Sequence, residues 1–200
     1  MAGCTEPSED EKRGRQIVGT VFVGVLYGVA MSQMLATLRE AFPTLSPTVY
    51  DLMLPIVFVV TSSRFAFGHA FHFVIDKSLR WSWSLDAGFV FVMSFIMILL
   101  GLTASIEASR TASVGFVTLL ISLYIVVVVF LAVVLAQKKK RKDIHKCWVL
   151  INAGATVLML LVWARSIDFY SPLGLSLVLL INLGAFGLDA TCSLALQDKS

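Results

Sequence analysis

The stretch Val114–Ala136, which reads VGFVTLLISLYIVVVVFLAVVLA, decides the fold class of this 200-residue chain. It contains no charged residue and is apolar on every side, which is typical of a helix surrounded by apolar material. Crossing a hydrocarbon core of about 30 Å takes about 20 residues of helix, whose backbone hydrogen bonds are satisfied internally. Strands of a membrane barrel would instead alternate apolar and polar residues over about ten positions. We therefore predict a transmembrane helix here and expect it to face lipid.

Five further stretches share this apolar character. The chain is 58% hydrophobic and 14% charged, with a mean hydropathy of +0.85, outside the range of soluble globular proteins. We predict an all-α, polytopic membrane protein in which residues 16–196 form one domain, a helical bundle with six transmembrane helices. The predicted spans are Gln16–Leu38, Tyr50–Phe73, Ala87–Ile106, Val114–Ala136, Cys147–Arg165 and Leu173–Leu194.

Basic residues are distributed unevenly between the two sides of this predicted bundle. One side holds both termini and twelve basic residues, whereas the other side holds three. Because cytoplasmic loops carry an excess of Lys and Arg, both termini are predicted to be cytoplasmic, in a plasma or inner membrane. The polar residues 1–15 are predicted to be a disordered cytoplasmic tail, and the net charge of +3 reflects topology, not nucleic-acid binding. The twelve are Lys12, Arg13, Arg15, Lys77, Arg80, Lys138, Lys139, Lys140, Arg141, Lys142, Lys146 and Lys199, and the three are Arg39, Arg110 and Arg165.

The sequence contains little that indicates an enzyme. No Ser-His-Asp, HExxH, CxxC or phosphate-loop motif is evident. Cys4, Cys147 and Cys192 are far apart in the sequence, so they are predicted to be free thiols. Enzymatic activity is therefore not the favoured interpretation.

Small residues recur at every fourth position of the first predicted span, at Thr20, Gly24, Gly28, Ser32 and Ala36. Small side chains let another helix backbone approach closely, which drives association in lipid. We name Gly24, Gly28 and Ser32 the small-residue face and predict that it packs against a helix. The partner is either another helix of the same chain or a second copy, and we expect a homo-oligomer.

Arg64 is the costliest residue to place in the second predicted span, because an arginine near mid-membrane costs at least ~2.5 kcal/mol. Counting 1.5 Å per residue from Tyr50 places Arg64 about 21 Å from the outer end of its span. The same count from Leu173 places Asp189 about 24 Å inward, and Asn152 falls at a similar depth. We predict a polar layer of Arg64, Asn152 and Asp189. It is either a gate or a site for an ion or substrate, or an ion pair that fixes helix packing.

His69, His72 and Asp76 follow at positions i, i+3 and i+7, on one face of a helix. This histidine face could bind a metal ion, relay protons, or consist of hydrogen-bonded interfacial histidines. Two histidines three positions apart on one helix cannot supply opposite axial ligands to one haem. No cofactor is therefore predicted, and a metal or haem at His69 and His72 is kept only as a less favoured option.

Three functions remain open from the sequence. The favoured one is an oligomeric channel or transporter for small ions or protons, in which the polar layer forms a constriction and the histidine face lines its cytoplasmic mouth. The first alternative is a non-catalytic membrane assembly or effector protein that acts by oligomerisation. The second alternative is a metal- or haem-dependent membrane redox enzyme.

Overall fold

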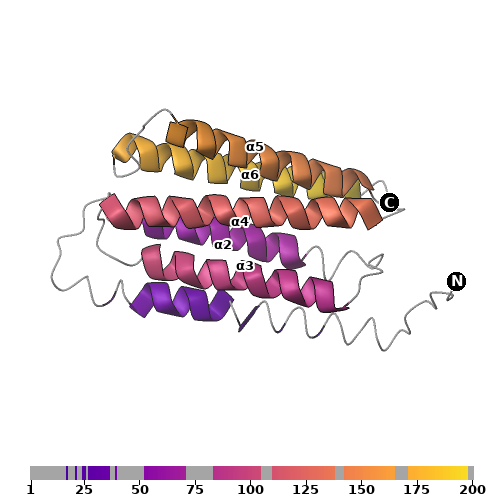
Figure 1. Cartoon of the computed structure of the whole chain (residues 1–200), viewed down its shortest axis with the longest axis horizontal. Helices are drawn as coiled ribbons and strands as arrows, with labels where there is room; N and C mark the ends of the chain where they lie inside the picture. Colours follow the sequence, from indigo (N-terminus) through magenta and orange to yellow (C-terminus); the bar gives the residue numbers. More distant parts are fainter. Residues whose placement is uncertain are drawn as a thin grey trace, which may run out of the picture.

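The computed structural model describes residues 17, 21, 24, 25, 27–36, 39, 52–70, 83–104, 110–137, 142–164 and 171–197. These ranges contain six helices and are helical almost throughout, which confirms the all-α class. Residues 27–36 form the main part of the first helix, drawn in indigo in Figure 1. The others are α2 (Met53–Ala70), α3 (Trp83–Ala104), α4 (Arg110–Gln137), α5 (Lys142–Ala164) and α6 (Pro172–Gln197).

The start of α6 shows how the local sequence sets a helix boundary. Ser171 precedes the helix, and its hydroxyl oxygen accepts a hydrogen bond from the backbone N–H of Gly174 at 3.1 Å. This satisfies one of the N–H groups that a helix start leaves without a partner. Pro172 takes the first helical position, where a missing N–H costs nothing. The two residues together set the start of α6.

Five helices form a closed ring around a common interior. α3 contacts α4, α4 contacts α5 and α5 contacts α6, so consecutive helices are neighbours. α2 contacts α3 on one side and α6 on the other, and this last contact closes the ring. Their axes run along the long dimension of the molecule (Figure 1). Polar side chains that point inward from different helices can therefore meet.

The outer surface of the bundle is apolar. Among the described residues, Leu150 is 72% exposed and Phe91 is 62% exposed, and many other large apolar side chains are exposed as well. Exposed apolar surface on this scale is unusual in soluble monomers. Within the described ranges, three segments are long and apolar enough to cross a membrane, namely Ser113–Ala136, Asp143–Ala164 and Pro172–Ala195. The described parts of α2 and α3 are apolar but shorter.

The prediction that the fourth span faces lipid is wrong for one side of α4. This helix lies between α3 and α5, and it is the most buried of the three long apolar segments. Phe116, Leu120 and Tyr124 are fully buried on it. The helix is apolar all round, so its sequence pattern does not distinguish the side that meets protein from the side that meets lipid.

The first helix packs against the bundle through residues that lie outside the small-residue face. Ala30 and Met34 are buried, whereas Gly24, Gly28 and Ser32 are exposed. A Cβ atom at Gly101 of α3 would lie 2.9 Å from the carbonyl oxygen of Ala30, so glycine there permits close approach of the two helices. A Cβ atom at Gly24 or Gly28 would meet nothing within 4 Å. Among the described residues of one copy, none covers the small-residue face, so its packing against a helix stays a prediction.

The prediction of free thiols is wrong for two of the three cysteines. Cys147 of α5 and Cys192 of α6 form a disulfide with a Cα–Cα distance of 6.8 Å. Cys4 lies outside the described residues. The sequence did carry a signal, because both cysteines fall at the predicted cytoplasmic ends of adjacent spans. The bond links α5 to α6 at the end of the bundle where α5 begins.

Candidate functional site

Arg64 occupies the interior of the helix ring. It is the largest side chain that is fully buried in the described part of the chain, and its side chain is only 1% exposed. Its Nε donates to Oδ2 of Asp189 at 2.5 Å, which joins α2 to α6. Burial of an unpaired charge is strongly unfavourable, so this carboxylate is the first requirement for Arg64 at this depth.

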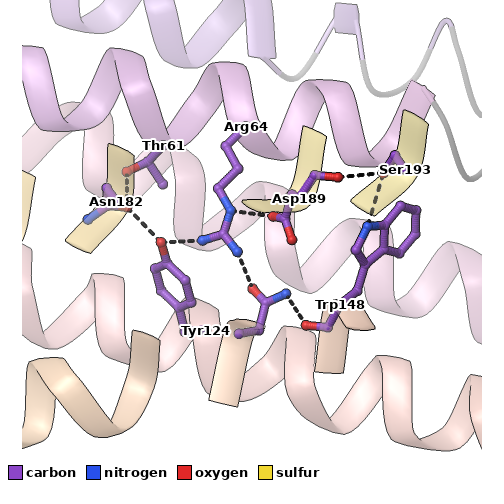
Figure 2. Close-up of polar contacts among 8 residues, drawn as sticks. Thr61, Arg64, Tyr124, Trp148, Asn182, Asp189 and Ser193 are labelled. Atoms are coloured by element: carbon purple, nitrogen blue, oxygen red, sulfur yellow. Dashed lines mark hydrogen bonds and ion pairs between the residues drawn. The ribbon is translucent and has the colours of Figure 1, made fainter. Parts of the chain in front are cut away.

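The other two guanidinium nitrogens also have partners (Figure 2). Nη1 donates to the hydroxyl of Tyr124 on α4, and Nη2 donates to Oδ1 of Asn152 on α5 at 3.1 Å. The guanidinium carbon lies 4.8 Å from the ring centroid of Tyr124 and 5.4 Å from that of Phe65. Aromatic faces attract cations at such distances. Polar side chains from three other helices, α4, α5 and α6, thus hold Arg64 of α2 in place.

A second group of polar side chains extends the site along α4 and α6. Tyr124 donates its hydroxyl proton to Oδ1 of Asn182 at 2.7 Å, and Thr61 Oγ1 lies 3.0 Å from the same oxygen. Asn182 in turn donates through Nδ2 to the carbonyl of Val178 at 2.8 Å. These residues are fully buried, and the bonds fix the orientation of the phenol that faces Arg64.

The opposite side of the site is tied to the disulfide end of the bundle. Asn152 donates through Nδ2 to the carbonyl oxygen of Trp148 at 2.7 Å. The Trp148 indole donates to the Ser193 hydroxyl at 3.2 Å, and that hydroxyl donates to the backbone carbonyl of Asp189 at 2.7 Å. Trp148 and Ser193 each adjoin a half-cystine in the sequence. The network and the disulfide together hold α5 against α6 beside Asp189.

Asp189 is only half satisfied. Its Oδ2 binds Arg64, but Oδ1 is buried and has no hydrogen-bond partner among the described residues. Buried polar atoms are paired in the large majority of cases, and water, an ion or a ligand is the usual partner where the protein supplies none. The Asp189 side chain is 14% exposed, compared with 1% for Arg64. Oδ1 is the oxygen of this pair that can accept a proton or a further hydrogen bond.

A cavity of about 60 Å³ opens beside this ion pair. One water needs roughly 10–15 Å³ of such space, so the cavity has room for several waters or for a ligand of a few atoms. Arg64, Asn152 and Asp189 form its polar end. Its walls are mainly apolar and come from four of the ring helices, with Phe65, Phe67, Met93, Val127, Phe130 and Leu131 among them.

Of the residues predicted as the site, the structure brings together Arg64, Asn152 and Asp189, which lie in direct contact. His69 falls within α2, but its side chain lies outside the described residues, as do His72 and Asp76. The histidine face and the metal or haem option attached to it therefore stay predictions.

Tyr124, Asn182 and Thr61 belong to the site although they are not among the residues predicted for it. A signal existed in the same count of 1.5 Å per residue. It places all three residues about 14 to 17 Å from the outer ends of their predicted spans. Equal depth on three spans is compatible with contact, and the structure shows that contact. Depth alone does not say which helices are neighbours.

Comparisons with known proteins find no matching family model, no matching curated protein and no matching solved structure. Function must therefore be inferred from the chemistry of the site, since a helix bundle by itself supports many functions. The site combines a buried cation, a carboxylate with one unpaired oxygen and a small cavity. Such a set can bind an anion at Arg64 and accept a proton at Asp189.

Proposed function

We propose that this chain is an integral membrane protein of a plasma or inner membrane, with six membrane-crossing helices and both termini in the cytoplasm. We further propose that it transports small ions or protons through the site at Arg64 and Asp189. The observation that carries the proposal is the buried ion pair of Arg64 and Asp189, which lines a cavity and in which Oδ1 of Asp189 has no partner among the described residues. Ionisable groups inside a membrane bundle commonly mark ion and proton pathways.

The ion pair has the properties of a two-state element. Protonation of Asp189 removes its negative charge and weakens its bond to Arg64. Arg64 would still have Tyr124 and Asn152 as partners, so the cation stays in place while the carboxylate leaves. α2 and α6 would then be freed from their closest polar contact. A site that alternates between two pairings can bind its cargo from one side and release it to the other.

A purely structural ion pair would be built differently. Pairs that serve stability alone gain most when every lone pair and proton is satisfied, because burial of the charges is costly. Here one carboxylate oxygen has no partner among the described residues, and the two residues of the pair line a cavity. This favours a site that exchanges its contents over one that only fixes helix packing.

Flux measurements on the purified chain in liposomes test the proposal. We expect uptake of protons or small ions above that of protein-free liposomes. Compared at equal amounts of folded protein, Arg64→Met should reduce this uptake at least about tenfold, since it removes a charge-assisted contact worth about 1.5–3 kcal/mol. Lys146→Met is the matched control, because Lys146 pairs with Asp143 at 3.3 Å but the two side chains are 59% and 80% exposed. Uptake that is equal in both variants would contradict transport through Arg64.

A second candidate is a non-catalytic membrane protein that acts by assembly into homo-oligomers. The observation that favours it is the exposed small-residue face, where Gly24 and Gly28 have no neighbour within 4 Å in the described part of the chain. Small residues at this spacing allow close packing of helices from two copies. The two candidates are compatible if the transporter is itself an oligomer.

A further inference from the structure

We infer that the transported species is a small monocarboxylate with a short apolar tail, which binds Arg64 and crosses together with one proton carried on Asp189. This inference rests on the proposed transport function and names its substrate class and coupling ion. Three observations support it: the way Asp189 engages the guanidinium, the charge balance of the site and the walls of the cavity.

Asp189 engages the guanidinium through one oxygen only. Arginine is suited to bind a carboxylate through two parallel hydrogen bonds, which are stronger and more specific than one. Asp189 makes a single bond from Nε to Oδ2, and its Oδ1 has no hydrogen-bond partner in the described part of the chain. A ligand carboxylate that approaches through the cavity can take the place of Oδ2 on Nε. The site therefore holds a carboxylate that a second carboxylate can replace.

The charge balance requires a proton to accompany the ligand. Arg64 and Asp189 form a neutral pair, and an anion added alone would leave one uncompensated negative charge in an apolar interior. If one proton binds Oδ1 of Asp189 as the anion arrives, Asp189 becomes neutral. Its bond to Nε is then replaced by that of the ligand carboxylate, and the net charge is unchanged. Release reverses both steps, so one anion and one proton cross with no net charge.

The other groups around Asp189 leave it as the acceptor for this proton. Among the described residues that line the cavity, Arg64 and Asp189 are the charged ones. From α4 the phenol of Tyr124 faces Arg64 as a hydrogen-bond partner. α5 contributes neutral Asn152 and Trp148 to the cavity, and it also carries His145, whose ring lies 5.5 Å from the Trp148 indole. His145 is thus the competing candidate that the experiment must separate.

The walls of the cavity select the rest of the ligand. The volume of about 60 Å³ is far below the roughly 300–1,000 Å³ typical of sites for drug-sized ligands, which favours a ligand of a few heavy atoms. Phe65, Phe130 and Leu131 present apolar surface opposite the polar end. Such walls disfavour an inorganic anion, which keeps its hydration shell, and Arg64 is the one cationic lining residue among those described. A second carboxylate on the ligand would have no partner there.

The test uses the full chain in liposomes, with labelled pyruvate as the probe and a pH-sensitive dye inside. Pyruvate is a small monocarboxylate whose neutral form is scarce at neutral pH, so passive leak is low. Potassium and valinomycin set the membrane voltage. We expect pyruvate uptake above protein-free liposomes, with one proton entering per pyruvate and a rate that does not depend on voltage. Arg64→Lys should lower the uptake at least about tenfold, because lysine lacks the planar fork.

Asp189→Asn gives the sharpest outcome, because asparagine imitates the permanently protonated carboxyl. Pyruvate uptake should persist in this variant, but without a proton, so it should become voltage-dependent. Asp143→Asn, which removes an exposed carboxylate of α5, should behave as the unchanged chain does. If His145→Gln abolishes the proton coupling and Asp189→Asn leaves it intact, the assignment of the proton to Asp189 is overturned.

A binding measurement covers the case in which Asp189→Asn does not fold. The unchanged chain in detergent and weak buffer should take up one proton for each pyruvate bound, and binding without proton uptake contradicts the inference. Chloride and nitrate should not compete with pyruvate, and octanoate should compete more weakly than propionate. If Arg64-dependent flux carries protons or inorganic ions and pyruvate neither crosses nor affects it, the transport function is supported and this substrate class is overturned. Failure to find any Arg64-dependent flux would overturn both.

Discussion

Arg64 Nε and Asp189 Oδ2 lie 2.5 Å apart although 125 positions of sequence separate the two residues. This contact joins α2 to α6, the pair of helices that closes the ring. The same carboxylate that balances the buried charge therefore also sets the arrangement of the bundle. A stability measurement on variants of these two residues therefore reports on their role in helix packing. A transport measurement on the same variants reports on their role in the site.

Removal of one partner of this pair should lower the stability of the bundle far more than removal of both partners. Arg64→Met leaves the carboxylate of Asp189 buried and unpaired, which we expect to cost about 3–5 kcal/mol of stability. Adding Asp189→Leu to that variant should restore most of the loss, because no charge then remains buried. Denaturant unfolding of the four proteins in detergent measures the coupling. Additive effects of the two substitutions would show that the residues do not interact.

The hydroxyl of Tyr124 should stabilise the bundle by holding two partners. Tyr124→Phe leaves Nη1 of Arg64 and Oδ1 of Asn182 each with one bond fewer, which we expect to cost about 1–3 kcal/mol. Thr118→Val is the matched control on the same helix, since the Thr118 hydroxyl is exposed and bonds its own helix at Val114. The control should change stability by no more than about 0.5 kcal/mol. Equal changes of stability in the two variants would show that the Tyr124 hydroxyl does not hold the site together.

Alkylation of cysteines distinguishes the disulfide from the free thiols that the sequence predicts. The unfolded chain should label at one cysteine before reduction and at three after it, because Cys147 and Cys192 are bonded and Cys4 is the third cysteine. Reduction should also cost about 4 kcal/mol of stability, as expected for a closed loop of this size, with a sequence separation of 45. A chain with both cysteines changed to alanine should not respond to reductant. Three labels before reduction would contradict the bond.

The lengths of the apolar runs predict the helices, and counting along them predicts the depth of the charged residues. How the helices pack against one another could not be predicted. Apolar runs place the helices, and counting along two of them brings Arg64 and Asp189 to similar depth. Which side of α4 meets protein is not encoded by its pattern, because lipid and protein interior are equally apolar. The burial of Tyr124 and the pairing of Cys147 with Cys192 depend on which helices are neighbours and how each is rotated. Neither property follows from one apolar run.

Gly101 should be less tolerant of a methyl group than other glycines of the bundle. Gly101→Ala places a Cβ atom 2.9 Å from the Ala30 carbonyl oxygen and 3.3 Å from Phe58, so the first helix must shift, at about 1–3 kcal/mol. Gly115→Ala is the control, since a Cβ atom there meets nothing within 4 Å and alanine favours a helix. Thermal unfolding of both variants in detergent gives the comparison. Equal melting of the two would show that the first helix does not pack at Gly101.

Substitutions on the small-residue face test oligomer assembly separately from the folding of a single copy. Gly24→Leu and Gly28→Leu add side chains to exposed positions of a helix, so the stability of a single copy should not fall and should rise by up to about 0.8 kcal/mol for each glycine replaced. If two copies pack through this face, the same changes keep their helices apart, and the oligomer should dissociate. Light scattering after size-exclusion chromatography in mild detergent measures the mass of the particle. Val21→Leu is the control at an exposed position of the same helix, where a large side chain is already present. An oligomer that persists in the double glycine variant would have to form through another surface, and the exposed leucines of α5 and α6 would then be the next surface to test.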